Sequence, residues 1–526
     1  MNRKTLLGLL ITLTFVGAIH ASETALVRNG TGEEILLQGF HWNASRNGSE
    51  KWYAVLTRMA GQIGQDGFTA IWMPPPWRDT SSWQSSTASG GGEGYFWRDF
   101  EKNGQYGSDD QLKQAAGELD SAGVKVVYDV VPNHMDDSAA VHSMFPRRSN
   151  EWRHDCGECD EGDPFMDGSA DLNTANAEVF DRFKNEFINL RDHYGAKGLR
   201  FDFVRGYAPE TVDRWMTGFG NQQLCVGEMW KGPGEYPEGD WHRQASWQDA
   251  LKDWSDRSHC MVFDFALKER MQNGSIAQWR DGLNGNPDPQ WRKVAVTFVD
   301  NHDTGYSPGL NQGQHHWPLV ESRRNQAYAY ILSSPGTPSV YWPDMYDWQR
   351  GDLIRQLISL RKGAGIKADS PIRFHTQFSG LVATSTGARK SLVIALDSDL
   401  TKLPPELAQP VLTWDDGKIR IWSVSAEPAP VSVRFTCNNA STQPGQSVYA
   451  VGSSLELGAW DPAHAIRLGN SLQGNRWTGT VDVPAQHVVE WKCIVRDNDS
   501  SAVVRWQPDP NVNFTSSAGG ETSGSF

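Results

Sequence analysis

Beyond its first 21 residues, the 526-residue chain has no apolar run long enough to form a transmembrane helix. It also lacks an excess of basic residues, because 49 Lys and Arg stand against 63 Asp and Glu and the net charge is −14. Binding to nucleic acid or to an anionic membrane surface by charge needs the opposite balance. We therefore expect a released protein with no nucleic-acid or membrane function, whose partner is neutral or cationic.

The first 21 residues have the pattern of a secretory signal. Basic residues at positions 3 and 4 precede an apolar run at 6–19, and small residues follow at 21 and 22. This run is too short to span a bilayer and is typical of a cleaved leader. We expect residues 1–21 to be removed and the mature chain to be secreted to the extracellular space.

Cysteine is scarce, and all six cysteines follow the leader. An even number in an exported chain indicates three disulfides, which we expect to pair in sequence order. The CxxC spacing of the first pair also occurs in redox and zinc sites, but the absence of a second CxxC favours a local disulfide. The six residues are Cys156, Cys159, Cys225, Cys260, Cys437 and Cys493.

Short apolar segments alternate with segments of helical length from residue 35 onward, which is typical of βα units on a parallel sheet. Residues 179, 180, 183, 187 and 190, for example, form one apolar helical face. Eight such units predict an α/β fold, a (β/α)₈ TIM barrel, within residues 22–365. The expected strands are 35–40, 68–73, 125–131, 198–204, 224–228, 261–265, 294–299 and 337–342.

Three further regions depart from this rhythm. Residues 132–175 are rich in Gly, Asp and Pro and predict a small inserted subdomain after the third strand. Alternating apolar residues then predict an antiparallel β domain at 366–424 and a separate β-sandwich module at 431–526. Residues 425–430, with two prolines, form a short stiff linker between them.

Three acidic residues stand where the expected barrel strands end. Asp202, Glu228 and Asp303 follow the fourth, fifth and seventh strands, and the carboxyl ends of barrel strands carry the functional groups. A single acid there is more often a helix cap or an ion-pair partner. Three acids, accompanied by Arg200 and His302, instead match the acid and the carboxylate that break a glycosidic bond.

Four short motifs occur in order at these strands: Asp129-Val-Val-Pro-Asn-His134, Gly198-Leu-Arg-Phe-Asp202, Val226-Gly-Glu228 and Phe298-Val-Asp-Asn-His-Asp303. They are similar to the motifs of the α-amylase family, glycoside hydrolase family 13. The resemblance implies retaining hydrolysis of α-1,4 glucosidic bonds in starch. It assigns Asp202 as nucleophile, Glu228 as general acid and base, and Asp303 as transition-state stabiliser.

The same resemblance assigns residues around the scissile bond. Arg200 lies two residues before Asp202 on one strand face and can keep the nucleophile ionised, whereas burial or neighbouring charge must hold Glu228 protonated. His134 and His302 are expected to hydrogen-bond sugar hydroxyls. Aromatic platforms are expected at Tyr95, Trp42 and Trp83, with Trp230 and Lys231 on the leaving side; core packing is the alternative for each tryptophan.

Longer segments such as Gly92-Glu-Gly-Tyr-Phe-Trp97 and residues 201–209 and 265–274 resemble the maltotetraose-forming exo-amylases. This implies release of maltotetraose from the non-reducing end, in a cleft closed at one side. In the loop Asp167-Gly-Ser-Ala-Asp171, where such relatives hold the chain end, Ser169 stands where an acid is expected, and Asp167 is the candidate to compensate.

A calcium site is expected in the inserted subdomain. Its side chains offer only oxygen ligands, which suit a hard cation, and the resemblance adds the carbonyl of Gly206. A solvated acidic loop is the alternative. The expected ligands are Asn133, Asp160, Asp163, Asp171 and Gly206. Relatives also hold a second calcium near the mature N-terminus, but residues 29–34 match it only in part.

The C-terminal module resembles family 20 starch-binding modules through Leu457-Gly-Ala-Trp460, Glu490-Trp-Lys492 and Trp506-Gln-Pro-Asp-Pro-Asn511. The resemblance implies an exposed platform of Trp460 and Trp506, with Lys492 and Asn511 bonding sugar hydroxyls. Tryptophans buried in the sandwich are the alternative. We expect starch and maltooligosaccharides as partners of a monomer, and keep three other functions open: an endo-acting amylase, a glucanotransferase and a non-catalytic starch-binding protein.

Overall fold

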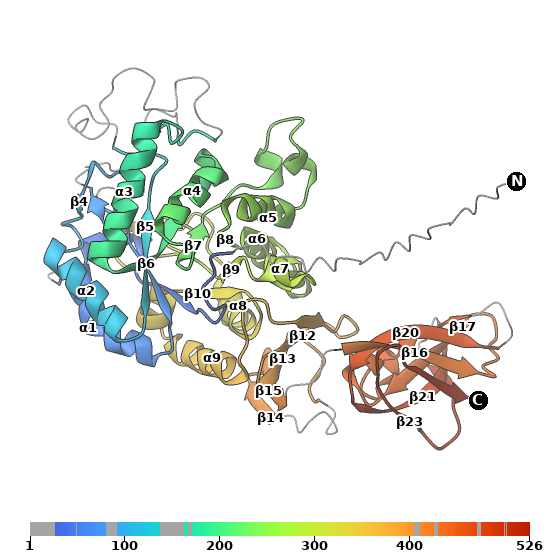
Figure 1. Cartoon of the computed structure of the whole chain (residues 1–526). Helices are drawn as coiled ribbons and strands as arrows, with labels where there is room; N and C mark the ends of the chain where they lie inside the picture. Colours follow the sequence, from blue (N-terminus) through green and yellow to red (C-terminus); the bar gives the residue numbers. More distant parts are fainter. Residues whose placement is uncertain are drawn as a thin grey trace, which may run out of the picture.

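Parallel strands close into a barrel in the computed structural model (Figure 1), which describes residues 27–48, 50–79, 92–136, 162–166, 171–403, 411–425, 430–470, 475–498, 500 and 502–526. The strand order around the barrel is β1-β10-β9-β8-β7-β6-β5-β2, so the predicted fold is confirmed. The strands are β1 (Leu36–Gln38), β2 (Ala70–Met73), β5 (Lys125–Val130), β6 (Ala196–Phe201), β7 (Leu224–Gly227), β8 (Met261–Phe263), β9 (Ala295–Phe298) and β10 (Thr337–Tyr341).

Each predicted barrel strand is present, and all eight are shorter than predicted. The buried run at 261–265, for instance, pairs only over Met261–Phe263, because Asp264 already caps the next helix by accepting a hydrogen bond from Leu267 N. A continuous apolar run marks burial on both faces of a parallel sheet. It does not mark the residue at which pairing stops.

Helices surround the barrel. Asn176 caps α3 (Ala177–Tyr194), which buries Val179, Phe183 and Leu190 as its periodicity predicts. The others are α1 (Trp52–Gln65), α2 (Asp109–Ser121), α4 (Pro209–Phe219), α5 (Trp247–Ser258), α6 (Phe265–Asn273), α7 (Pro289–Arg292), α8 (Glu321–Ser333) and α9 (Gly351–Ala364). In the part of the chain that the structure describes, the helices are all too short or too polar to cross a membrane.

Short elements fill the loops. The two-stranded sheet of β3 (Trp77–Arg78) and β4 (Asp99–Lys102) follows β2. Most of the predicted insertion at 132–175 lies outside the described residues. The single-turn elements are η1 (Trp42–Arg46), η5 (Val204–Gly206), η6 (Pro233–Glu235), η7 (Trp241–Gln244), η8 (Ile276–Asp281), η9 (Leu283–Gly285), η10 (Leu310–Gln312), η11 (Pro343–Asp347), η12 (Leu455–Leu457) and η13 (Pro462–His464).

An antiparallel sheet follows α9, in the order β11-β12-β13-β15-β14. Its central strand β13 contacts α8 and α9, so the sheet is attached to the barrel. Leu381, Ala383, Ile394 and Ile421 belong to the barrel's own hydrophobic core. The strands are β11 (Ile372–Phe374), β12 (Leu381–Thr386), β13 (Lys390–Leu396), β14 (Val411–Asp415) and β15 (Ile419–Ser425).

The C-terminal module is a sandwich of two sheets. One has the order β19-β20-β16-β24, and the other has β18-β17-β21-β22 with β23 added to β21. Trp477 and Trp491 are buried between them. The strands are β16 (Pro430–Asn438), β17 (Gln446–Gly452), β18 (Ile466–Arg467), β19 (Gly469–Asn470), β20 (Trp477–Pro484), β21 (Val488–Asp497), β22 (Val503–Trp506), β23 (Val512–Thr515) and β24 (Glu521–Ser525).

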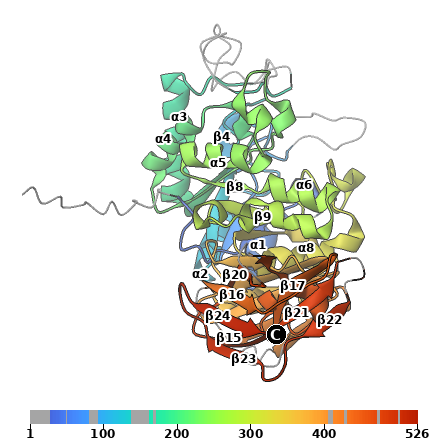
Figure 2. The ribbon, with the colours of Figure 1, turned by 90° about the vertical axis from the view of Figure 1, so that its right-hand side faces the viewer.

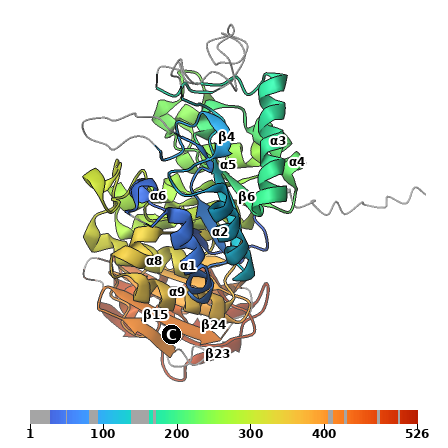
Figure 3. The same cartoon turned by 90° about the vertical axis from the view of Figure 1, so that its left-hand side faces the viewer.

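The sandwich docks against the preceding sheet, on the side away from α3 and α4 (Figures 2 and 3). Leu455 of the module is 2% exposed and lies in an apolar cluster with Phe378 and Val393 of the other sheet. Gln377 Nε2 donates to the Leu455 carbonyl at 2.5 Å, and His464 Nε2 lies 3.4 Å from Asp399 Oδ2. The module is therefore packed onto its neighbour.

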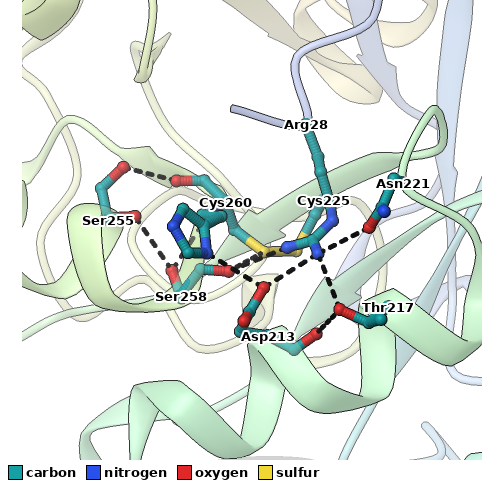
Figure 4. Close-up of a disulfide and its surroundings, with 9 residues drawn as sticks. Arg28, Asp213, Thr217, Asn221, Cys225, Ser255, Ser258 and Cys260 are labelled. Carbon is teal, nitrogen blue, oxygen red and sulfur yellow. Dashed lines mark hydrogen bonds and ion pairs between the residues drawn. A yellow bond between two sulfur atoms is a disulfide. The ribbon is translucent and has the colours of Figure 1, made fainter. Parts of the chain in front are cut away.

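Two of the predicted disulfides are present among the described residues. Cys225 and Cys260 join β7 to the residue before β8, and Cys437 and Cys493 join the two sheets of the sandwich. Cys156 and Cys159 lie outside the described residues. Beside the first bridge, buried Arg28 donates to Ser258 O at 3.1 Å and to Asp213 Oδ1 at 2.8 Å (Figure 4), which attaches the start of the described chain to the barrel.

Candidate active site

One buried arginine joins the acidic groups at the carboxyl ends of the barrel strands. Arg200, on β6, is fully buried, and its Nη1 lies 2.6 Å from Asp202 Oδ1 and 2.9 Å from Asp129 Oδ1. Its Nη2 lies 2.8 Å from Glu228 Oε1. Arg200 on β6, Asp202 directly after this strand and Asp129 on β5 thus point toward one another. The structure brings Asp202 and Glu228 together as predicted.

Glu228 follows directly after β7 and is 7% exposed. Phe203 N donates to its second oxygen at 3.2 Å, and Phe203 itself has a left-handed φ of 46°, which is uncommon for a bulky residue. Burial, followed by the charges of Asp202 and Asp303, raises the pKa of Glu228 well above its usual value, against the opposing effect of Arg200. Glu228 is therefore suited to donate a proton.

Asp303 stands at the turn after β9. Its N–H donates to Asn301 Oδ1 at 3.0 Å, and its Oδ2 lies 3.2 Å from His302 Nε2. Burial raises the pKa of Asp303 to about 7, with Arg200 opposing and Asp202 adding to the shift. Burial in this site therefore makes the ionised form of its acidic groups less favourable.

A second buried network, which the sequence analysis missed, supports this turn. Asp300 Oδ1 accepts from Lys268 Nζ at 2.7 Å and from Thr304 Oγ1 at 3.0 Å. Arg324 binds the other oxygen of Asp300 and also Asp344, at 3.0 Å. Lys268 and Asp300 are fully buried. Two cations thus fix the residue that begins the Asp303 turn.

The two predicted histidines lie in the site. Gln38 Nε2 and His302 Nδ1 are 2.9 Å apart, and with Gln38 donating, the proton of His302 faces Asp303. His134 is 1% exposed, and neither of its ring nitrogens has a hydrogen-bond partner among the described residues. Burial lowers the pKa of His134 to about 4, so the ring is neutral. The neutral ring stacks on Phe165 at 3.7 Å, and its nitrogens are of the kind that bonds a polar ligand such as a sugar hydroxyl.

The predicted platforms Trp42 and Tyr95 lie beside His302. Their rings are parallel within 7° at 5.8 Å, and Tyr95 is parallel to His302 within 11° at 5.2 Å. Tyr95 OH donates to Asp129 Oδ2 at 2.8 Å, which fixes the ring next to the arginine network. Trp83 lies outside the described residues.

Trp230, which is expected on the leaving side of the scissile bond, follows Glu228 by two residues. Its ring is parallel to Phe265 at 5.3 Å and to Trp317 at 6.3 Å, in an aromatic wall that the sequence analysis did not find. Lys231 is 7% exposed and binds Asp163 Oδ1 at 2.8 Å. The ammonium of Lys231 is thus already paired within the protein.

Part of the predicted calcium cluster is described. Asn133 Oδ1 is buried without a hydrogen-bond partner in the described chain, and Asp171 accepts from Asn133 Nδ2 at 3.1 Å. A Cβ at Gly206 would meet Asn133 Oδ1 at 2.0 Å, so this backbone lies against the amide. Asp163, another expected ligand, binds Arg205 and Lys231 with its two oxygens. Asp160 lies outside the described residues.

The predicted residues of the module lie near the middle of β21 in its second sheet, where β17, β22 and β23 end or begin. Trp506, on β22, is 44% exposed and pairs with Ile494, two residues from Lys492 on the neighbouring strand β21. Trp460 N donates to Gly452 O at the end of β17. Lys492 binds Asp509, and Asn511 Nδ2 donates to Glu490 Oε2 at 3.3 Å.

Asp129, Trp72 and Tyr207 also belong to the active site, although the sequence analysis assigned them no role. Asp129 accepts from Trp72 Nε1 at 3.0 Å as well as from Arg200, and Tyr207 OH donates to Asp202 O at 3.1 Å. Asp129 begins one of the four motifs, which was a usable signal. A buried acid, a carboxylate nucleophile and a cation between them match the needs of glycoside hydrolysis.

Sequence models of three known families match this chain. They are "Alpha amylase, catalytic domain" at residues 63–155, "Glucan 1,4-alpha-maltotetraohydrolase, domain C" at 346–408 and "Starch binding domain" at 430–525. Glucan 1,4-α-maltotetraohydrolase of Stutzerimonas stutzeri is 54% identical, over 100% of this chain and 99% of that protein. The enzyme of the same name from Roseateles saccharophilus is also 54% identical, over 95% of both.

Solved structures share the fold. The γ-CGTase of alkalophilic Bacillus clarkii matches 96% of this chain and 99% of its own with a TM-score of 0.52 and 18% identity. An α-amylase of Geobacillus thermoleovorans matches 86% of this chain and 96% of its own with a TM-score of 0.52 and 16% identity. At these identities the likeness concerns the fold alone.

Proposed function

Because the chain belongs to the glucan 1,4-α-maltotetraohydrolases of the α-amylase family, we propose that it hydrolyses α-1,4 glucosidic bonds of starch with retention and releases maltotetraose from non-reducing ends. The observation that carries this proposal is the position of Arg200, which contacts Asp202 and Glu228 at 2.6 and 2.8 Å. The guanidinium of Arg200 thus gives Asp202 a counter-ion and at the same time contacts Glu228.

In the first step, Asp202 attacks the anomeric carbon, and the bond from that carbon to the glycosidic oxygen breaks. Glu228 gives its proton to this oxygen, so the leaving chain departs with a free hydroxyl. Asp202 then carries the glucosyl unit as an ester. The raised pKa of Glu228 keeps its proton available near neutral pH.

In the second step, Glu228 is ionised and removes a proton from water, whose oxygen attacks the anomeric carbon. The ester bond to Asp202 breaks, which restores both carboxyl groups. Asp303, held at its turn by Asn301 and His302, faces the positive charge that develops on the sugar. His134 and His302 bond sugar hydroxyls, and Tyr95 and Trp42 form the ring platforms.

Calcium fits the described part of the predicted cluster, because Asn133 Oδ1 is a buried oxygen without a hydrogen-bond partner in the described chain and Asp171 lies beside it. We assign Asn133, Asp171, the Gly206 carbonyl and, from the sequence, Asp160 to this site. Asp163, also expected from the sequence, pairs with Arg205 and Lys231 in the described chain and stays a candidate ligand. A bound calcium would tie the insertion to the segment after β6. Chelation should lower the melting temperature, and Asp171→Asn should remove the difference.

The module would hold starch on Trp460 and Trp506, with Lys492 and Asn511 at the edge of the platform. Flat indole faces exposed to solvent suit the apolar face of glucose, and tethering raises the local concentration of substrate. Two disulfides and the sequence of residues 1–21 support secretion. On this proposal the protein acts on starch to which its own module is bound.

Product analysis tests the proposal. Soluble starch is digested briefly and the first products are separated by chromatography. A dominant tetrasaccharide is expected. A broad ladder of products would instead indicate endo action, and cyclic or elongated products a glucanotransferase.

A further inference from the structure

A tryptophan stands exposed in the loop that follows the acid. Trp241 is 55% exposed, although the loop that carries it, between β7 and α5, also carries Trp230 and Lys231. Figure 1 shows this green segment projecting above α5. A large apolar ring in solvent costs free energy unless something covers it.

The Trp241 ring is fixed from behind. It stacks on His242 at 3.9 Å and 27°, and His242 stacks on Tyr236 at 4.5 Å and 13°. His242 Nδ1 lies 2.7 Å from Asp240 Oδ1, and its Nε2 lies 3.2 Å from Asp253 Oδ2 on α5. One face of Trp241 is thus supported by an imidazole that two carboxylates hold in place.

The stack continues to a residue of the segment that carries Glu228. Lys231 Nζ lies 4.3 Å from the centroid of the Tyr236 ring, and Lys231 follows Glu228 by three residues. The three rings and Lys231 therefore form one continuous stack, which joins the segment just after Glu228 to the surface at Trp241. Arg243 and Gln244, both exposed, follow Trp241 in the chain and offer groups that bond hydroxyls.

We propose that Trp241 is a remote platform for the leaving part of the glucan chain, on which a glucose unit beyond the bond-cleaving subsites stacks. This rests on the proposed function, because it takes α-1,4 glucan as the substrate. A ring held rigidly before binding loses little conformational entropy when a sugar stacks on it. Long chains reach Trp241, and short oligosaccharides do not.

The test compares a long and a short substrate in the full-length protein. Trp241→Ala should raise KM for soluble amylose about two- to tenfold, as expected for one lost stacking contact, with kcat unchanged. KM for maltopentaose should stay at the wild-type value. Trp241→Phe should restore most of the amylose affinity, because it keeps a flat ring.

Leu310→Ala is the matched control, since Leu310 is a large apolar residue that is 54% exposed, in the loop after β9. It should change neither KM. An equal change for both substrates in Trp241→Ala, or a loss that Trp241→Phe does not restore, overturns the platform and leaves a structural role. Unchanged KM values for both substrates in Trp241→Ala overturn the platform as well. If the wild-type protein cleaves neither substrate, the proposed function itself fails.

Discussion

Arg200 Nη1, on β6, lies 2.6 Å from Oδ1 of Asp202, the residue that directly follows this strand. The other nitrogen of the same guanidinium lies 2.8 Å from Glu228 Oε1. The proposed nucleophile and the proposed acid thus share one cation, which is itself fully buried. The geometry of the two reacting carboxyl groups depends on the strand that carries Arg200, and each group can be tested separately.

Glu228→Gln should lower kcat on soluble starch by about 10²- to 10⁴-fold, because the amide cannot donate or accept the catalytic proton. Initial rates of reducing-sugar release measure the effect. Adsorption to granular starch should stay unchanged, since the module is distant in sequence from Glu228. Turnover at the wild-type rate would mean that another group is the acid.

Asp303→Asn should stabilise the protein at alkaline pH. The folded-state pKa of Asp303 is raised to about 7, mainly by burial, so the folded protein holds this proton more tightly than the unfolded chain. The stability that the protonated Asp303 side chain contributes to the wild type is therefore lost as pH rises toward 7. Asn does not titrate. The melting temperature of the variant should therefore exceed that of the wild type at pH 8 and approach it near pH 4.

The Asp303→Asn protein should have little activity at any pH, because the stabilising carboxylate is gone. Equal melting-temperature differences at pH 4 and pH 8 would contradict the burial argument. They would leave only a pH-independent packing effect.

Lys268→Met should destabilise the fold by about 3–5 kcal/mol, the usual cost of removing one partner of a buried ion pair. Burial lowers the pKa of Lys268, and Asp300 is its counter-ion. Denaturant unfolding measures the loss. At a temperature where the variant is folded, kcat should fall more than KM rises, because the turn of Asp303 is displaced. Unchanged kcat would separate this network from the catalytic turn.

Trp506→Ala should weaken adsorption to granular starch while leaving kcat on maltopentaose unchanged. The ring is 44% exposed on β22, so its removal costs little stability. Val488→Ala, at a residue that is 63% exposed on β21, is the control and should adsorb normally. Normal adsorption of Trp506→Ala would place the starch platform elsewhere.

Leu455→Asp should release the sandwich from the preceding sheet, because it puts a charge into the apolar cluster of Phe378 and Val393. Small-angle scattering should show a larger radius of gyration. Protease should also cut more quickly between the sheet and the sandwich. An unchanged scattering curve would show that the remaining contacts hold the two units together.

The barrel was predictable from the sequence because its strands are continuous apolar runs. Val126, Val127 and Tyr128 are buried whichever face they take, so no periodicity had to be resolved. The ends of the strands were less predictable, as at Asp264, where a capping hydrogen bond decides the end. The fold was therefore predicted well and the element boundaries only roughly.

The candidate site was predictable where a motif names the residue. The network of Lys268, Asp300, Arg324 and Asp344 was not, because it joins residues from four separate segments, and no local pattern records their pairing. The ion-pair partners of Asp163 could not be predicted for the same reason. Its acidic character suggested a metal, whereas its partners Arg205 and Lys231 lie far along the chain.

The packing of Leu455 has a consequence for how the enzyme faces its substrate. A module on a free tether lets the barrel turn in any direction above a starch surface, and its reach depends on the length of the tether. A docked module fixes the orientation of the barrel relative to that surface. Lengthening the segment between β15 and β16 would then leave reach unaltered for as long as the contact at Leu455 holds.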